Sequence, residues 1–295
     1  FGLPLIPVGL GWWLLDVSNR LLLERLASSH DLGLYSLGYK MAHILTFVVI
    51  TPFSTAWGAY MYRTLRSPRA NETYVWVGTH YMLLLSLVGI GLVAFTRPVL
   101  RLMSDPAFWG AHRVVLPLVA ASIAHGMMSI LSMGINITKR TQHFSYIIGL
   151  GGVLSVGLNL LLIPPFGMMG AGVSLFIAYF VTMIASWRVA ERFHPIPFEI
   201  GRMTRIGLVF GVGGVLSVVQ IDHAAGDLAF RVLMVVLFLA GLLAAGALEE
   251  RDVLALRRLY GGLRREKGLR AKMRFGADLF RPDPAERAVG PDRRT

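Results

Sequence analysis

Cysteine is absent from the 295-residue chain, and charged residues make up only 16% of it. The lack of cysteine excludes a disulfide framework, a thiolate nucleophile and any cysteine-based zinc or iron–sulfur site. The charged fraction lies well below the roughly 25% of an ordinary soluble domain, whereas hydrophobic residues reach 55% and the mean hydropathy is +0.59. This composition excludes an ordinary soluble protein and indicates an integral membrane protein.

Signatures of enzymatic chemistry are also missing. The sequence contains no Gly-x-x-x-x-Gly-Lys-Ser/Thr loop for ATP and no His-Glu-x-x-His motif for zinc. It also lacks paired carboxylates in a plausible aqueous active-site loop. We therefore predict a protein that is not an enzyme and has no catalytic residues, metal or cofactor.

Long apolar runs dominate the first 248 residues. A helix needs about 20 mostly apolar residues to cross about 30 Å of hydrocarbon, and such runs favour helices over β-barrel strands, which are about ten residues long. We predict an all-α integral membrane protein with about eight transmembrane helices. They are expected at residues 3–22, 33–57, 74–95, 114–137, 144–163, 170–189, 204–221 and 229–248.

The net charge of +12 is concentrated outside these runs. In a soluble protein this charge would suggest nucleic acid, but its placement predicts a membrane surface and no nucleic-acid partner. Because basic loops stay in the cytoplasm, both ends of this segment are expected to be cytoplasmic. The richer set of loops holds Arg63, Arg66, Arg69, Lys139, Arg140, Arg188, Arg192, Arg202 and Arg205, and the opposite set holds Arg25, Arg97, Arg101, Arg113 and Arg231.

Residues 249–295 form a basic tail, predicted to be amphipathic at first and then disordered. Its polybasic run at 264–274 would attract anionic inner-leaflet lipids by about 1 kcal/mol per charge. A solvated anchor that only sets the topology explains the same run equally well.

Two segments resemble one transporter family. Residues 19–42, NRLLLERLASSHDLGLYSLGYKMA, resemble the start of the second half of polysaccharide flippases, where an Asp-Arg pair precedes an apolar run, a Gly-x-Tyr-Ser motif and a lysine. Residues 159–172, NLLLIPPFGMMGAG, are similar to an Asn-x-x-Leu-Ile-Pro-x-x-Gly-x-x-Gly-Ala hairpin of the same superfamily. The superfamily includes O-antigen and exopolysaccharide flippases, lipid II flippases and multidrug exporters. One departure is Asn19, which stands where many relatives carry aspartate.

The resemblance implies two six-helix lobes around a central cavity, sometimes followed by two further helices. Residues 1–190 would then be the second-lobe bundle, and residues 191–248 the additional two-helix hairpin. Because the chain starts at Phe1 rather than at methionine and a span begins at once, we expect a missing N-terminal lobe of the same protein as a partner.

The function implied by the resemblance is translocation of undecaprenyl-diphosphate-linked oligosaccharide across the bacterial inner membrane. This step serves lipopolysaccharide or exopolysaccharide biosynthesis. The alternatives are a transporter of the same fold for lipid II or drugs, and a membrane glycosyltransferase or polymerase of the same pathway. The last would need a large charged outer loop, whereas the predicted outer loops are short.

The hairpin at 159–172 also has a physical explanation. Pro164 and Pro165 end the preceding helix because proline lacks an N–H group and clashes with the preceding turn. Gly167 and Gly170 permit a tight reversal and close helix contact. Asn159 is expected to form a hydrogen bond across helices, so the segment is interpreted as a packing device.

Charged residues at membrane depth are the candidate substrate-binding site. Asp16 and Arg20 are four residues apart on the first span, and Lys40 and His43 lie at a similar depth on the second. One reading is a buried ion pair of Asp16 with Arg20 or Lys40 that only neutralises charge. The other is a basic cavity wall that attracts a diphosphate, with a bidentate fork from arginine and a point charge from lysine. His125 is interpreted as a hydrogen-bonded bundle residue rather than a proton carrier.

Overall fold

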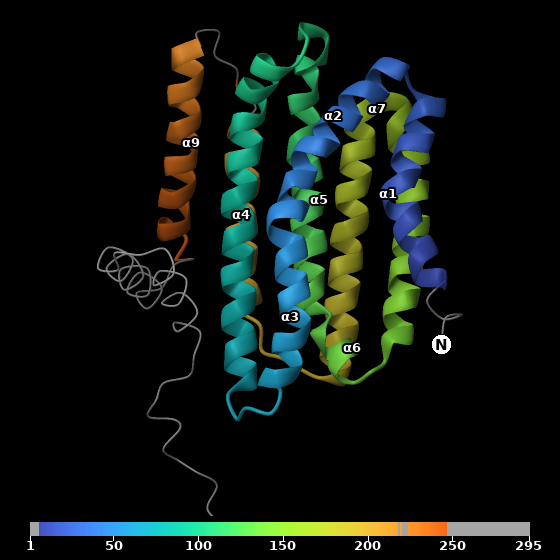
Figure 1. Ribbon diagram of the computed structural model, residues 1–295, viewed down its shortest axis with the longest axis vertical. Helices are drawn as coiled ribbons and strands as arrows, with labels where there is room; N and C mark the ends of the chain where they lie inside the picture. The colour runs from blue at the N-terminus through green and yellow to red at the C-terminus, as the bar shows by residue number, and fades with distance from the viewer. Residues whose placement is uncertain (1–5, 218, 220–223, 247–295) are drawn as a thin grey trace, which may run out of the picture. The chain divides into compact units, whose positions relative to one another are not determined.

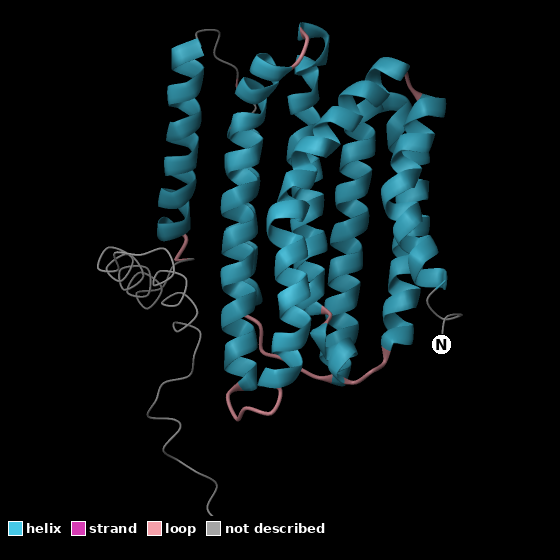
Figure 2. Ribbon diagram, viewed as in Figure 1, coloured by secondary structure: helices cyan, strands magenta, loops and turns pink. Residues whose placement is uncertain are grey.

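The structure consists of helices and short helical turns (Figures 1 and 2). It is a computed structural model that describes residues 6–217, 219 and 224–246, and within these ranges it contains no β-strand. The predicted basic tail lies outside the described residues. The elements are α1 (Ile6–Leu26), α2 (Ser29–Leu45), the π-helical turn η2 (Thr46–Ile50), α3 (Thr51–Thr64), α4 (Ala70–Met103), the 3-10 turn η3 (Pro106–Ala111), α5 (His112–Leu131), α6 (Met133–Ile137), α7 (Thr141–Phe193), α8 (Ile200–Leu216) and α9 (Ala224–Ala244).

Five helical segments are long and apolar enough to cross a membrane, so the chain is a multi-pass membrane protein. The predicted count of about eight transmembrane helices is not supported. α1 is interrupted by charged residues in its second half, α8 has only 17 residues, and the runs expected at 144–163 and 170–189 belong to the single segment α7. The five segments are Ser29–Thr64, Ala70–Met103, Pro106–Ile137, Gln142–Phe193 and Gly226–Ala244.

α7 folds back on itself at Gly167, where φ is 52° and ψ is −130°. This φ lies in the left-handed region that glycine adopts without steric cost. Pro164 and Pro165 occupy the end of the first leg. At Gly170 a Cβ atom would meet the backbone carbonyl oxygen of Leu162 on that leg. The two legs therefore approach so closely that a side chain at this position cannot fit.

The core of the bundle lies around α5, which packs against α2, α4 and α7. Its residues Val114, Val115 and Val119 are completely buried. α1 packs along α7 through glycine on both helices. A Cβ atom at Gly11 would lie 2.8 Å from the Ile148 side chain, so α1 sits almost backbone to backbone on α7. Small residues permit such close helix packing in membranes.

α8 and α9 pack against each other and against α4. A buried ion-pair network joins α4 to the start of α9: the Arg231 Nε and Nη2 atoms donate to the two Asp227 oxygens at 2.9 Å, and Arg97 Nη1 lies 3.4 Å from Asp227 Oδ1. Arg231 also donates to the Ala94 carbonyl oxygen. The expectation that Arg97 and Arg231 lie in loops is wrong, because both are buried within helices.

A second polar contact joins α4 to the start of α8. Thr79 Oγ1 donates to Glu199 Oε2 at 3.3 Å, and Arg202 Nη1 pairs with the same oxygen at 3.1 Å. The connections 64–70, 137–141 and 193–200 share one end of the bundle, the lower end in Figure 1. Most basic residues of the richer loop set belong to these connections or border them, and their cytoplasmic location stays a prediction.

Candidate functional site

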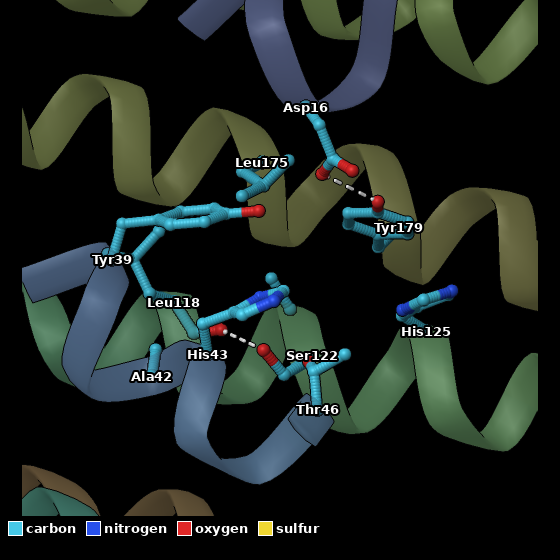
Figure 3. A pocket seen from close by; sticks show the side chains of 11 residues that line it. Asp16, Tyr39, Ala42, His43, Thr46, Leu118, Ser122, His125, Leu175 and Tyr179 are labelled. Atoms are coloured by element: carbon cyan, nitrogen blue, oxygen red, sulfur yellow. Dashed lines mark hydrogen bonds between the residues drawn. The ribbon is translucent and has the colours of Figure 1, made fainter. Parts of the chain in front are cut away.

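A small polar cavity of ≈ 50 Å³ lies between α1, α2, α5 and α7 (Figure 3). This volume has room for a few water molecules. It is far smaller than the roughly 300–1,000 Å³ of pockets that enclose a drug-sized ligand. The cavity is lined by Asp16 of α1, Tyr39, Ala42 and His43 of α2, Thr46 of η2, Leu118, Ala121, Ser122 and His125 of α5, and Leu175 and Tyr179 of α7.

Asp16 is the carboxylate of this cavity, and its side chain is half-buried. Its Oδ1 atom accepts a hydrogen bond of 2.9 Å from the Tyr179 hydroxyl, as Figure 3 shows. The structure records no ion pair of Asp16 with Arg20 or Lys40 among the residues it describes. Among the described residues, the carboxylate is therefore held by a neutral hydroxyl rather than by a cation.

Aromatic rings surround the carboxylate. The His125 ring lies 5.0 Å from the Trp12 ring, edge to face, and 5.2 Å from the Tyr179 ring. On the α2 side, Tyr39 stacks on His43 with a centroid distance of 5.6 Å. Such ring pairs contribute about 0.5–1.5 kcal/mol each beyond their buried area. These contacts pack the His43 and His125 rings, which line the cavity, against neighbouring aromatic rings.

Arg20 and Lys40 are both exposed and do not line the cavity. The Arg20 guanidinium lies over the Tyr39 ring, 4.6 Å from its centroid. Because Tyr39 itself lines the cavity, Arg20 contacts the cavity wall through this ring. Of the four predicted site residues, the structure brings Asp16 and His43 into the cavity, places Arg20 beside it and leaves Lys40 on the outer surface of α2.

The π-helical turn η2 follows directly after this part of α2. Thr51 N–H donates to the Thr46 carbonyl oxygen, the wider spacing of a π-helix. Pro52 near the start of α3 lacks an N–H group, so the regular series of backbone hydrogen bonds of the helix is interrupted here. π-helical turns of this kind are frequent at functional sites. This turn places Thr46 in the cavity wall.

Asn19 and Asn159 join α1 to the first leg of α7. Asn159 Nδ2 donates to Asn19 Oδ1 at 2.9 Å, and Asn19 Nδ2 donates to the Leu15 carbonyl oxygen at 2.6 Å. Both asparagine side chains are completely buried. An aspartate at position 19, as in the family motif, would place a charge in this closed environment. The amide instead serves as an interhelical hydrogen-bonding group.

Tyr39 and Tyr179 have roles that the sequence did not reveal. Tyr179 lies 163 residues from its partner Asp16, and no local pattern marks it. Tyr39 lies in the GLYSLGYK segment, but it is uncharged, so a search for charged residues at membrane depth does not identify it. Within the described ranges, no group of three or more histidine or acidic residues could hold a metal ion.

Comparisons with protein-family models, with curated proteins and with solved structures found no match. The resemblance to polysaccharide flippases therefore rests on the two sequence motifs.

Proposed function

We propose that this chain is part of a membrane flippase that translocates undecaprenyl-diphosphate-linked oligosaccharide across the bacterial inner membrane. The observation that carries the proposal is two exposed basic residues on neighbouring helices: Arg20 of α1, which lies over a ring of the cavity wall, and Lys40 on the outer surface of α2. The family motifs support the same assignment.

Lys40 is the more informative of the two residues. It lies eleven residues inside the apolar segment Ser29–Thr64, or about 16 Å along the helix from Ser29. A lysine that faces lipid at the centre of a membrane helix costs about 2.5–3.5 kcal/mol or more. Because the bundle does not bury Lys40, this face of α2 is suited to an aqueous pathway or to an opposing protein wall.

The chemistry of the basic pair fits a diphosphate head group. Arginine offers a planar fork that binds two phosphate oxygens at once, and lysine offers a compact charge. Tyr39 holds the Arg20 guanidinium beside the cavity. The small volume of the cavity excludes a bound sugar chain, so we place the cargo on the exposed side of α1 and α2.

A second candidate, export of a cationic compound, is favoured by Asp16 alone. This carboxylate lines the cavity without a cationic partner among the described residues. The same fold could also carry lipid II, whose head group contains the same diphosphate. The two anionic cargoes differ in which saccharide accumulates when transport stops.

The test is deletion of the encoding gene, followed by restoration from a plasmid. We expect loss of surface polysaccharide together with accumulation of lipid-linked oligosaccharide that faces the cytoplasm. Unchanged surface polysaccharide with new sensitivity to cationic drugs would favour the second candidate. Cell-wall failure with accumulated lipid II would identify lipid II as the cargo, and no phenotype in any of the three assays would refute a transport function.

A further inference from the structure

The turn between α6 and α7 carries two exposed basic residues, Lys139 and Arg140. It connects the apolar segments Pro106–Ile137 and Gln142–Phe193, so both residues lie where two membrane segments end. Figure 1 shows this turn at the lower end of the bundle, as it does the connection 193–200. This position corresponds to the depth of lipid head groups. The turn does not line the cavity and is independent of the transport proposal.

The guanidinium of Arg140 is positioned by an aromatic ring. It lies over the ring of Phe193, 4.6 Å from the centroid. The His143 ring meets the same Phe193 ring edge to face, with a centroid distance of 4.9 Å. Among the described residues, the structure records no ion pair or hydrogen bond for this guanidinium. A guanidinium that stacks on a ring keeps the N–H groups in its own plane free to bind phosphate oxygens.

Lys139 places a second charge in the turn on an unusual backbone. Its φ is 57°, and no other residue except glycine has a positive φ in the part of the chain that the structure describes. The turn closes the end of α6, because the Arg140 N–H donates to the Ile135 carbonyl oxygen at 3.1 Å. Glycine is the usual residue at such a position, and a lysine there is strained. Strain of this kind often accompanies a functional requirement, here for the lysine charge.

An exposed apolar stripe on α7 begins six residues after Arg140. It consists of Tyr146, Leu150 and Val153, which are 69%, 70% and 65% exposed. Spacings of four and three residues place them on one face of the helix. The same face is open at Gly157, where a Cβ atom would meet nothing within 4 Å. A basic turn followed by an open apolar face matches the head group and the acyl chain of a phospholipid.

We propose that the basic turn of Lys139 and Arg140, together with the apolar stripe, binds an anionic phospholipid. The phosphate oxygens accept hydrogen bonds from the Arg140 guanidinium, and the Lys139 ammonium adds attraction at the same membrane surface. One acyl chain lies along the apolar stripe. A zwitterionic lipid carries its own cation beside the phosphate, so it gains less from two basic residues and binds more weakly.

The experiment measures the thermal unfolding midpoint of the purified full chain in neutral detergent. The probes are short-chain phosphatidylglycerol, phosphatidylcholine with the same chains, and glycerol phosphate, which has no acyl chain. We expect phosphatidylglycerol to raise the midpoint by a few degrees at saturation. The other two probes should need at least tenfold higher concentrations for the same rise. An equal response to phosphatidylcholine or to glycerol phosphate would overturn the assignment to an anionic lipid.

The test variant is Arg140→Gln, and the matched control is Arg66→Gln, an exposed arginine in the connection 64–70 at the same end of the bundle. Arg140→Gln should need at least tenfold more phosphatidylglycerol for the same rise, whereas Arg66→Gln should respond like the wild type. Lys139→Gly removes the charge and the backbone strain, so it should raise the midpoint without lipid and weaken the response to lipid.

Three results would overturn the proposal. The first is a wild type that does not respond to phosphatidylglycerol. The second is a wild-type response in Arg140→Gln, because the polybasic run at 264–274 would then account for the effect. The third is an equal loss in Arg66→Gln, because the response would then depend on the total charge and not on a site at Arg140.

Discussion

Replacing Asp227 by asparagine should destabilise the contact between α9 and α4 more than any other single carboxylate-to-amide change in the described chain. The carboxylate is 3% exposed and accepts two hydrogen bonds of 2.9 Å from Arg231 and one of 3.4 Å from Arg97. Arg231 is 2% exposed, so its charge would be left without a counter-charge. Breaking a buried ion pair from one side costs about 3–5 kcal/mol, and we expect the free energy of unfolding to fall by about this amount.

The assay is equilibrium unfolding of purified protein in mixed micelles. Glu199→Gln is the matched control, because Glu199 pairs with Arg202 while its side chain is 34% exposed. That change should cost less, about 1–2 kcal/mol, because Glu199 is partly exposed and the buried Arg202 keeps another interaction. The double change Asp227→Leu, Arg231→Leu should lose less than the sum of the two single changes, since no orphan charge remains on α9. A loss below about 1 kcal/mol for Asp227→Asn would refute a structural ion pair.

Three further predictions address the packing and the topology. Gly170→Ala should lower the free energy of unfolding by about 1–3 kcal/mol, because its Cβ atom meets the backbone of the facing leg. The control Gly157→Ala lies in open space on the same helix and should leave the free energy of unfolding equal or raise it by up to about 1 kcal/mol. Equal effects of the two changes would contradict the tight hairpin. Asn159→Leu should cost about 1–2 kcal/mol in the same assay because the buried Asn19 Oδ1 atom loses its donor, and replacing both asparagines by leucine should recover part of that loss. In the cysteine-free chain, Pro68→Cys should react with a membrane-impermeant thiol reagent in inverted vesicles and not in intact cells, and the reverse result would invert the topology.

The helical, membrane-embedded character of the fold could be predicted because it depends on local composition. Apolar runs of about 20 residues identify spanning helices. The proline–glycine segment around Gly167 predicts a reversal of the chain from its local sequence alone. The count of spans was less predictable. α1 carries charges and α8 is short, so neither sequence identifies a membrane span by itself. Their places in the bundle follow from packing, of α1 against α7 and of α8 against α4 and α9.

The candidate site could be predicted only where charge and helical spacing were informative. Asp16 and His43 do line one cavity, but helical depth does not tell which way a side chain points, and Lys40 faces away from it. The partner of Asp16 could not be found, because a tyrosine 163 residues away becomes its neighbour only through the packing of α1 on α7.

The buried ion pair of Arg97 with Asp227 was missed for the same reason. Its members lie 130 residues apart, and each stands at the edge of an apolar run, where a charge is normally interpreted as part of a loop. A carboxylate four residues before an arginine, as in Asp227 and Arg231, was the available signal.

The most direct test of the proposed flippase function is the export of surface polysaccharide by cells that carry Arg20→Lys or Lys40→Ala, measured beside the amount of the protein in the membrane. Arg25→Lys, an exposed arginine of the same helix, is the control. A charged hydrogen bond to the diphosphate contributes about 1.5–3 kcal/mol, so each site variant should lower export about tenfold or more at normal protein levels. Normal export by both site variants at normal protein levels would contradict the assignment of Arg20 and Lys40 to the cargo path.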